Sequence, residues 1–315
     1  MKKFSTYVFV LLMPVFVVFS INIFIDKHNS SKFNKKLIED LILNDSLVIK
    51  TSLSDRQFVK NRINFQKSYR QNIVLGSSRS ILIGKPIDFE VENYSMSGAI
   101  INDFENVYYY LKDKNVQIDT VFLEISPWIF NQNTTENRYM DFNKISFKRR
   151  IKKLFSVSYL KQNLISNKYL PTKNEQDFIW YSDGTISYNY KFQTQDNIKS
   201  IKQFLKKKDI YHLDGFNSIK KLNTNRLVKL IKRMIRDNST PILLKHPYPP
   251  LINSKIISLY PNIKITDKLI DSLTKKFKIK SIGTFYPEEL NINNDDYYDA
   301  MHMKPRGIKK LLQIK

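Results

Sequence analysis

Asn72-Ile73-Val74-Leu75-Gly76-Ser77-Ser78-Arg79-Ser80 is the stretch of sequence that decides the fold. Its apolar residues stop abruptly at a glycine and a cluster of serines. This pattern predicts a short buried strand that ends in a tight turn. Functional side chains of parallel α/β sheets gather where strands end, so Ser78 stands where a nucleophilic hydroxyl is most useful.

Strand-like and helix-like segments alternate from residue 72 onward. The strand patterns lie at 73–75, 89–94, 120–125, 241–244 and 279–282. The helix patterns lie at 102–112, 218–236, 254–276, which Pro261 is expected to break, and 305–312. Such alternation predicts a parallel sheet that is covered on both faces. We therefore expect an α/β fold, a three-layer α/β/α domain with a parallel, roughly five-stranded sheet, over residues 71–315.

About ninety residues, 127–216, break this alternation, and we interpret them as an insertion. Its many aromatic residues indicate that the insertion folds. Residues 180–188 predict a hairpin that turns at Asp183-Gly184. Residues 147–155 predict a basic amphipathic helix, which either rests on an anionic surface or has a solvated basic face. We expect the insertion to cover the cleft.

The N-terminus begins with Lys2 and Lys3 and continues with an apolar run over residues 7–25. A bilayer requires about 20 such residues. No small-x-small cleavage site follows, which favours a retained anchor over a signal peptide. We expect a transmembrane anchor over 1–26, a helical connector over 27–70, and a main domain outside the cytoplasm. A buried hydrophobic helix is the alternative for the first segment.

The composition excludes several kinds of chemistry. The 315-residue chain has no cysteine, which removes disulfides, thiolate catalysis and cysteine-ligated metals. No His, Asp or Glu cluster has metal-ligand spacing, so neither a metal nor a cofactor is expected. The net charge of +23 suits anionic partners, although lysine spread widely, as in proteins of AT-rich genomes, explains it equally well. No motif combines stacking and basic residues, so nucleic acid is not an expected partner.

A serine hydroxyl needs a base before it can act as a nucleophile. The chain has four histidines, at positions 28, 212, 246 and 302. His302 follows the last predicted strand, and Asp299 precedes it by three residues, a spacing that lets a carboxylate orient the ring. His246 follows the fourth predicted strand and is a weaker candidate. We expect Ser78, His302 and Asp299 to be catalytic.

Donors for a developing oxyanion are expected after the second strand. Asn93-Tyr94-Ser95-Met96-Ser97-Gly98 leads from that strand into a helix. Gly98 has no side chain, so its backbone N–H can approach a substrate closely. A plain helix-capping loop is the alternative interpretation.

Together these motifs resemble the SGNH (GDSL-like) hydrolase superfamily. Gly76-Ser77-Ser78 resembles the first block, which ends a strand with Gly-Asp-Ser and supplies the nucleophile. Residues 93–98 resemble the second block with its oxyanion glycine, and Asp299-x-x-His302 resembles the last block with the other triad members. The lipase elbow Gly-x-Ser-x-Gly is absent, which disfavours the ordinary α/β-hydrolase fold.

The sequence departs from the family pattern at two places. Ser77 stands where the family has Asp, and the strand over 120–125 ends in Ser-Pro-Trp where the third block has Gly-x-Asn. The resemblance implies that Ser126 takes the place of that Asn as a donor to the oxyanion. Both departures are similar to the membrane-anchored branch that includes the D-alanine transfer protein of teichoic acid synthesis and the alginate O-acetyltransferases.

This resemblance implies a membrane-anchored serine esterase or O-acyltransferase that acts on acyl esters of cell-envelope polysaccharide. Its triad would be Ser78, His302 and Asp299, and its oxyanion donors would be Gly98, Ser78 and Ser126. The implied partners are a cell-surface polysaccharide or its acyl donor, and a multi-pass membrane acyltransferase. The alternative is a catalytically inactive SGNH-like module that binds or escorts an anionic surface polysaccharide.

Overall fold

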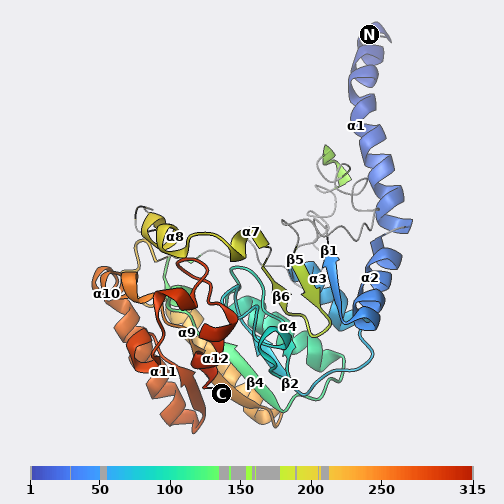
Figure 1. Cartoon of the computed structure of the whole chain (residues 1–315). Coiled ribbons are helices and arrows are strands. Elements are labelled where there is room, and N and C mark those ends of the chain that lie inside the picture. The colour runs from blue at the N-terminus through green and yellow to red at the C-terminus, as the bar shows by residue number, and fades with distance from the viewer. Residues whose placement is uncertain are drawn as a thin grey trace.

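A parallel five-stranded sheet forms the centre of the described structure, a computed structural model that describes residues 2–28, 30–49, 55–134, 142, 154–157, 160, 178–188, 190–204, 206 and 213–313. The strand order is β3-β2-β4-β7-β8, and Figure 1 labels its strands β2 and β4. These strands are β2 (Asn72–Leu75), β3 (Glu92–Asn93), β4 (Thr120–Glu124), β7 (Thr240–Lys245) and β8 (Lys280–Gly283). The predicted α/β class and the predicted parallel sheet are confirmed.

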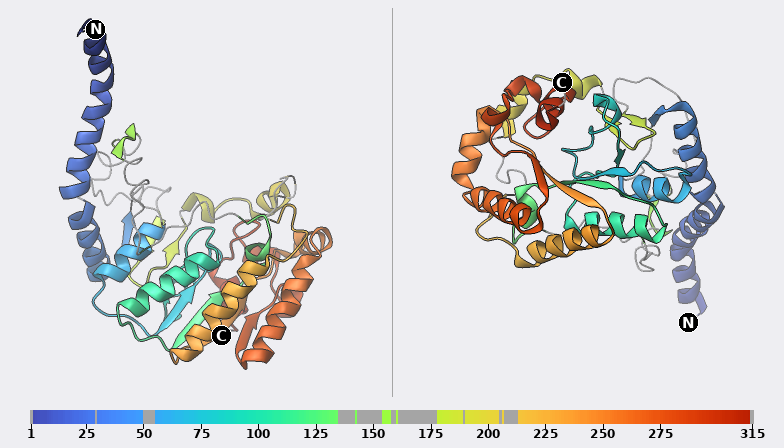
Figure 2. Two further views of the ribbon diagram at one scale, coloured as in Figure 1. Left: turned by 180° about the vertical axis from the view of Figure 1, so that it is seen from behind. Right: turned by 90° about the horizontal axis from the view of Figure 1, so that it is seen from below.

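Alternate residues of each strand pack on opposite faces of the sheet, as the period of a strand requires. Ile73 and Leu75 belong to one hydrophobic cluster, whereas Val74 between them belongs to the other. The first cluster includes α4 (Ile101–Asp113), α9 (Lys221–Arg236) and α11 (Asn262–Phe277), which lie side by side on one face (Figure 2, left). The second includes α12 (Pro305–Leu312) and residues 81–87. The layers are therefore helix, sheet and helix.

The observed bounds confirm one sequence expectation and shorten another element. The helical segment over 254–276 was expected to break at Pro261, and it is two helices, α10 (Pro250–Leu259) and α11, because Pro261 between them has no N–H to donate. The strand predicted over 89–94 is reduced to the two residues of β3, which alone pair with β2. The insertion also contains α7 (Tyr190–Gln193) and α8 (Asn197–Phe204).

A second, antiparallel sheet joins the connector to the insertion. Its strands are β1 (Ser46–Ile49), β5 (Phe178–Tyr181) and β6 (Ile186–Ser187), in the order β1-β5-β6. The predicted hairpin is confirmed by the β5–β6 pairing, and Gly184 in its turn has the positive φ of 89° that glycine tolerates. The connector was expected to be helical, so β1 was not predicted, because its partner lies about 130 residues away.

Both helices of the connector region pack into the domain. α2 (Ser30–Asn44) and α3 (Asp55–Phe65) each contribute buried residues to the second hydrophobic cluster. Arg62 of α3 is buried, forms an ion pair with Glu92, and donates to the carbonyl of Asn93. α3 is therefore an integral part of the domain, although the sequence placed it in a connector.

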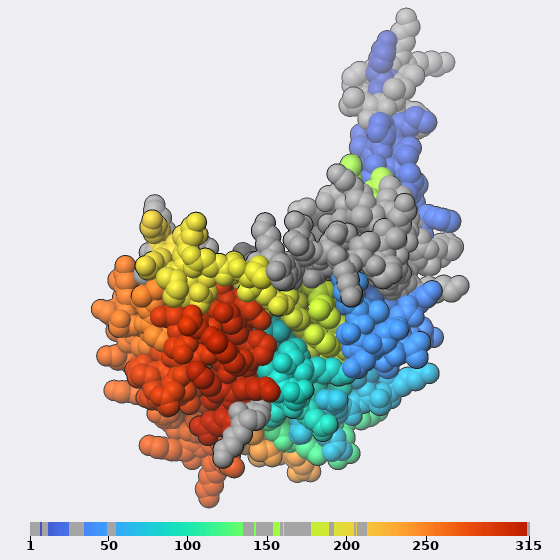
Figure 3. All heavy atoms as spheres, in the orientation of Figure 1, coloured from blue at the N-terminus to red at the C-terminus, as the bar shows by residue number. Residues whose placement is uncertain are grey.

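α1 (Lys2–His28) is a helix of 27 residues that projects from the body (Figures 1 and 3). Within the described residues, no helix has both the length and the apolar character that a membrane crossing requires. The C-terminal part of α1 contacts the insertion, because Asn22 donates to the carbonyls of Leu154 and Ser156. The predicted basic helix over 147–155 lies outside the described residues except for Leu154 and Phe155.

Candidate active site

The candidate residues gather at one edge of the sheet. Ser78 follows β2, Gly98 follows β3, Ser126 follows β4, and Asp299 and His302 follow β8. These strands are parallel, so their carboxyl ends meet at that edge. The direction of connection reverses at β2, which has β3 on one side and β4 on the other. Such a switch point is where open α/β sheets bind ligands.

Ser78, His302 and Asp299 form a continuous hydrogen-bonded relay. The Ser78 Oγ lies 3.0 Å from the Nε2 atom of His302, although the two residues are 224 positions apart. The Nδ1 atom of His302 lies 2.9 Å from the Oδ2 atom of Asp299. An ionised carboxylate only accepts hydrogen bonds, so Nδ1 carries the ring proton and Nε2 faces the serine with its lone pair. This is the geometry of a serine with a general base.

The surroundings of Asp299 keep its carboxyl ionised. Burial raises the pKa of this group, but hydrogen bonds from the His302 ring and from the backbone N–H groups of Met301 and His302 outweigh it. The pKa of Asp299 therefore lies below its usual value. The two backbone donors lie 2.7 and 2.8 Å from Oδ1. A fixed negative charge thus lies beside the ring that would become positive during proton transfer.

Two backbone N–H groups that follow β2 and β3 have no hydrogen-bond acceptor among the described residues. Within the described residues, neither the N–H of Ser78 nor that of Gly98 donates a hydrogen bond. Gly98 has a φ of 59°, a left-handed conformation. Helix α3 supports this turn, since Asp55 accepts from the N–H of Ser97 and Arg56 donates to the carbonyls of Ser97 and Gly98. Both groups can therefore serve as oxyanion donors.

Ser126 lies at the expected edge of the sheet, but its hydroxyl has another partner. Its Oγ donates to Oε1 of Glu124 at 2.6 Å. A hydroxyl has one proton, so in this arrangement Ser126 does not offer it to an oxyanion. Glu124 is only 1% exposed and was not among the expected site residues. The sequence could have indicated Glu124 as a site residue, because it is a charged residue at the end of an otherwise apolar strand.

His246 contacts Ser80 and not the candidate nucleophile. Its Nε2 lies 3.0 Å from the Ser80 Oγ, and the side chain is fully buried. Burial lowers the pKa of His246 to about 4, although Glu124 nearby opposes this effect. Of the other histidines, His28 ends α1 and His212 lies outside the described residues. His302 is thus the histidine that meets Ser78.

The insertion supplies aromatic side chains to the candidate site. The hydroxyl of Tyr188, which follows β6, donates to the carbonyl of Ser78 at 3.1 Å. The rings of Tyr188 and Phe192 have centroids 5.3 and 5.8 Å from that of His302. Figure 3 shows the yellow segment that contains α7 and α8 running across the red C-terminal region. The insertion therefore contributes side chains beside the relay, and the expectation that it covers a cleft stays a prediction.

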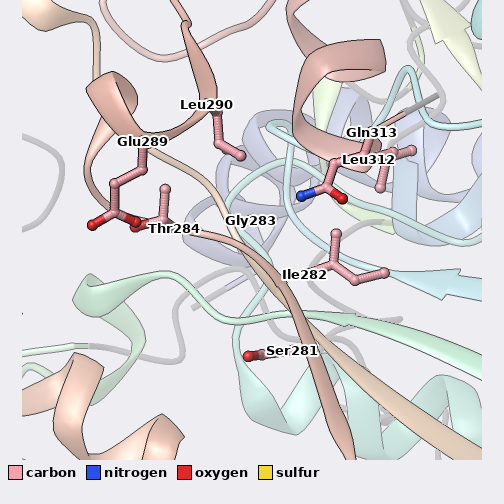
Figure 4. Close-up of a pocket in the computed structure, with 8 residues that line it drawn as sticks. All are labelled: Ser281, Ile282, Gly283, Thr284, Glu289, Leu290, Leu312 and Gln313. Atoms are coloured by element: carbon pink, nitrogen blue, oxygen red, sulfur yellow. The ribbon is translucent and has the colours of Figure 1, made fainter. Parts of the chain in front are cut away.

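A surface cavity of about 360 Å³ lies elsewhere, beside β8 (Figure 4). Its walls include Gly283, Glu289, Leu312 and Gln313, and no member of the Ser78 relay. Among the residues that the structure describes, no group of three metal-ligating side chains occurs. This cavity is therefore separate from the Ser78 relay.

Comparison with known proteins adds no relative. No family model, no curated protein and no solved structure matches the chain. The class of protein rests on the fold and on the relay, an α/β domain with a Ser-His-Asp arrangement at the carboxyl edge of a parallel sheet.

Proposed function

We propose that the chain is a membrane-anchored serine esterase or O-acyltransferase of the SGNH type, acting on acyl esters of cell-envelope polysaccharide. The observation that supports this most directly is the relay from Ser78 through His302 to Asp299, with contacts of 3.0 and 2.9 Å. A serine whose hydroxyl faces an oriented imidazole is suited to attack an acyl carbonyl.

The proposed reaction proceeds through an acyl-enzyme. The Ser78 Oγ bonds to the carbonyl carbon of the ester while its proton passes to Nε2 of His302. The N–H groups of Ser78 and Gly98 stabilise the oxyanion, and His302 then protonates the departing alcohol. Water or a glycan hydroxyl next attacks the acyl-enzyme and gives its proton to His302, which returns a proton to the departing Ser78 Oγ.

The polysaccharide and the membrane enter this proposal through the family resemblance and the sequence. A net charge of +23 favours an anionic polymer as substrate or acceptor. The apolar run over residues 7–25 is the proposed anchor, which would place the main domain outside the cytoplasm. A transferase also needs an acyl donor from across the membrane, and a multi-pass membrane acyltransferase is the proposed source.

Reaction with a fluorophosphonate probe tests the proposed nucleophile. We expect the full chain in detergent to be labelled, and both Ser78→Ala and His302→Ala to lose the label, because the first lacks the nucleophile and the second lacks its base. Ser281→Ala changes an exposed serine of β8 and is the matched control, which should label as the wild type does. A folded wild-type protein that does not react would contradict the proposal.

One observation favours a second candidate, a catalytically inactive module that binds an anionic polysaccharide. Ser126, which the family resemblance offered as a side-chain oxyanion donor, is bound to Glu124. Only the backbone N–H groups of Ser78 and Gly98 then remain as proposed oxyanion donors. Loss of one donor from an oxyanion hole typically lowers kcat by about 100- to 1,000-fold. Polysaccharide binding that survives in Ser78→Ala, without probe labelling of the wild type, would favour this candidate.

A further inference from the structure

Glu124 is a buried carboxylate that the proposed reaction does not use. It ends β4 and accepts four hydrogen bonds. Oε1 accepts from the hydroxyls of Ser77 at 2.7 Å and Ser126 at 2.6 Å. Oε2 accepts from the N–H of Ser77 at 2.6 Å and the hydroxyl of Ser80 at 2.8 Å. Short hydrogen bonds of this kind are typical of an ionised acceptor, and they satisfy both of its oxygens.

The charge of Glu124 is balanced inside the same cluster. Burial raises the pKa of Glu124, but the charge of Arg79 and the hydroxyl donors Ser126 and Ser77 outweigh it and hold the pKa below its usual value. His246 is itself neutral, so the balancing positive charge is Arg79. The Nη2 atom of Arg79 donates to the carbonyls of His246 and Pro247 at 3.0 and 2.5 Å. The cluster therefore contains one buried charge of each sign.

The hydrogen bonds of Glu124 hold the turn on both sides of the nucleophile. Ser77 precedes Ser78 and Ser80 follows it by two residues, and both are bonded to the same carboxylate. The turn fits closely around this group, because a Cβ atom at Gly76 would lie 2.9 Å from Oε2 and 2.6 Å from the Cβ of Ser80. Glycine at position 76 therefore leaves the room that the Ser80 side chain and the Glu124 carboxylate occupy.

We propose that Glu124 is a positioning residue for Ser78. Its carboxylate fixes the 76–80 turn, so that the Ser78 Oγ stays in contact with His302 and the Ser78 N–H stays available to the oxyanion. This inference rests on the proposed function, since it concerns the same serine. It adds a second requirement to the site, a carboxylate that never touches the substrate.

Two substitutions separate the shape of Glu124 from its charge. Glu124→Gln keeps the shape, since its amide oxygen can accept from the N–H of Ser77 and the hydroxyl of Ser80, while its NH2 group donates to the oxygens of Ser77 and Ser126. Glu124→Ala removes the anchor of the turn altogether. Glu92→Gln is the matched control, because Glu92 is also buried and paired with an arginine, Arg62.

The measurement is the second-order rate of fluorophosphonate labelling against pH, together with kcat and KM for p-nitrophenyl acetate and the melting temperature. We expect Glu124→Ala to label about 100-fold more slowly, the typical effect of a misplacement of about 1 Å, and Glu124→Gln to lose less. KM and the midpoint of the labelling rate against pH should stay unchanged, because the substrate contacts and the His302–Asp299 pair are intact. Glu92→Gln should lower the melting temperature without slowing the labelling.

The possible results are distinguishable. If the wild type is labelled and a folded Glu124→Ala variant is labelled at the same rate, this inference is overturned and the proposed function is left intact. If Glu124→Ala does not fold, Ser77→Ala and Ser80→Ala each remove one hydroxyl from the carboxylate, and wild-type rates in both also overturn it. A wild type that does not label overturns the proposed function and this inference together.

Discussion

His246 donates to Ser80 in a short chain of hydrogen bonds. The Ser80 proton faces Glu124 at 2.8 Å, so the Nε2 of His246, 3.0 Å from the Ser80 Oγ, must be the protonated ring nitrogen. A second ring proton would sit on Nδ1, which is buried and has no hydrogen-bond partner in the described structure. Burial beside the Arg79 charge therefore keeps this ring neutral, with its pKa lowered to about 4.

This neutral histidine makes stability depend on pH. Below about pH 6.5 the unfolded chain protonates His246, whereas the folded protein does not until about pH 4. The free energy of unfolding should therefore fall as the pH drops through that window, by up to about 1.4 kcal/mol per pH unit for this one proton. Urea unfolding from pH 7 to pH 4.5 measures it. His246→Gln, which cannot titrate, should show a shallower slope, and an identical slope would contradict the assignment.

The relay residues and their supports differ in how far the sequence could reveal them. Asp299 and His302 are three residues apart, so their contact is local and could be predicted. Glu124 lies 44 to 47 residues from Ser80 and Ser77, and only the pairing of β2 with β4 brings it to the turn. The Gly-Asp-Ser motif that residues 76–78 resemble has its carboxylate beside the nucleophile, at the place of Ser77. Here a carboxylate reaches the same turn from the neighbouring strand.

The hairpin of β5 and β6 brings Tyr188 onto the nucleophile turn, and removal of its hydroxyl tests this contact. Tyr188→Phe loses the hydrogen bond to the Ser78 carbonyl but keeps the ring beside His302. One such bond contributes about 1 kcal/mol, so we expect roughly fivefold slower fluorophosphonate labelling. Tyr181→Phe, on the same hairpin, is the control. Unchanged labelling in Tyr188→Phe would show that the insertion does not hold the turn.

Asn22 links α1 to the insertion, and its loss should loosen that contact. Its Nδ2 donates to the carbonyls of Leu154 and Ser156 at 2.8 and 3.2 Å, and Phe19 stacks on Phe155 with centroids 4.4 Å apart. Asn22→Leu removes both bonds, about 1–2 kcal/mol in total. We expect faster tryptic cleavage within residues 143–160, located by mass spectrometry.

The control for this substitution is Ser20→Leu, which changes an exposed position of the same helix. It should leave the cleavage pattern as in the wild type. Equal cleavage rates in Asn22→Leu and the wild type would show that the insertion is held by other contacts. The link itself could not be predicted, because a single Asn in an apolar run gives no indication of a partner more than 130 residues away.

The sequence predicted the parallel sheet but not the elements of the domain whose partners lie far away in the chain. The parallel sheet was predicted because each strand carries its own apolar signal and each is followed by a helix. β1 lacked such a context, and α3 looked like a separate helix until Arg62 was seen in its buried ion pair with Glu92. The domain thus includes chain that lies before residue 71, and the boundary predicted there is not a structural one.

The proposed anchor is the whole-molecule property most open to a direct test. The side chains of α1 leave much apolar surface exposed, with Phe16 54% and Phe24 63% accessible. Residues 7–25 would span about 29 Å as a helix, close to the thickness of about 30 Å of a hydrocarbon core. We expect the full chain to stay in the membrane pellet after alkaline carbonate extraction. Replacing Leu12 and Phe16 by lysine should release it, because each lysine costs about 2.5–3.5 kcal/mol at the centre of a bilayer.

Orientation can be measured in the same cells because the chain contains no cysteine. Ser281→Cys places a single thiol at an exposed position of β8, and Lys3→Cys places one before the apolar run. If the main domain lies outside the cytoplasm, a membrane-impermeant maleimide should label intact cells through position 281 and not through position 3. Labelling at both positions only after lysis would place the domain in the cytoplasm, away from any surface polysaccharide. The relay would then need an intracellular ester as its substrate.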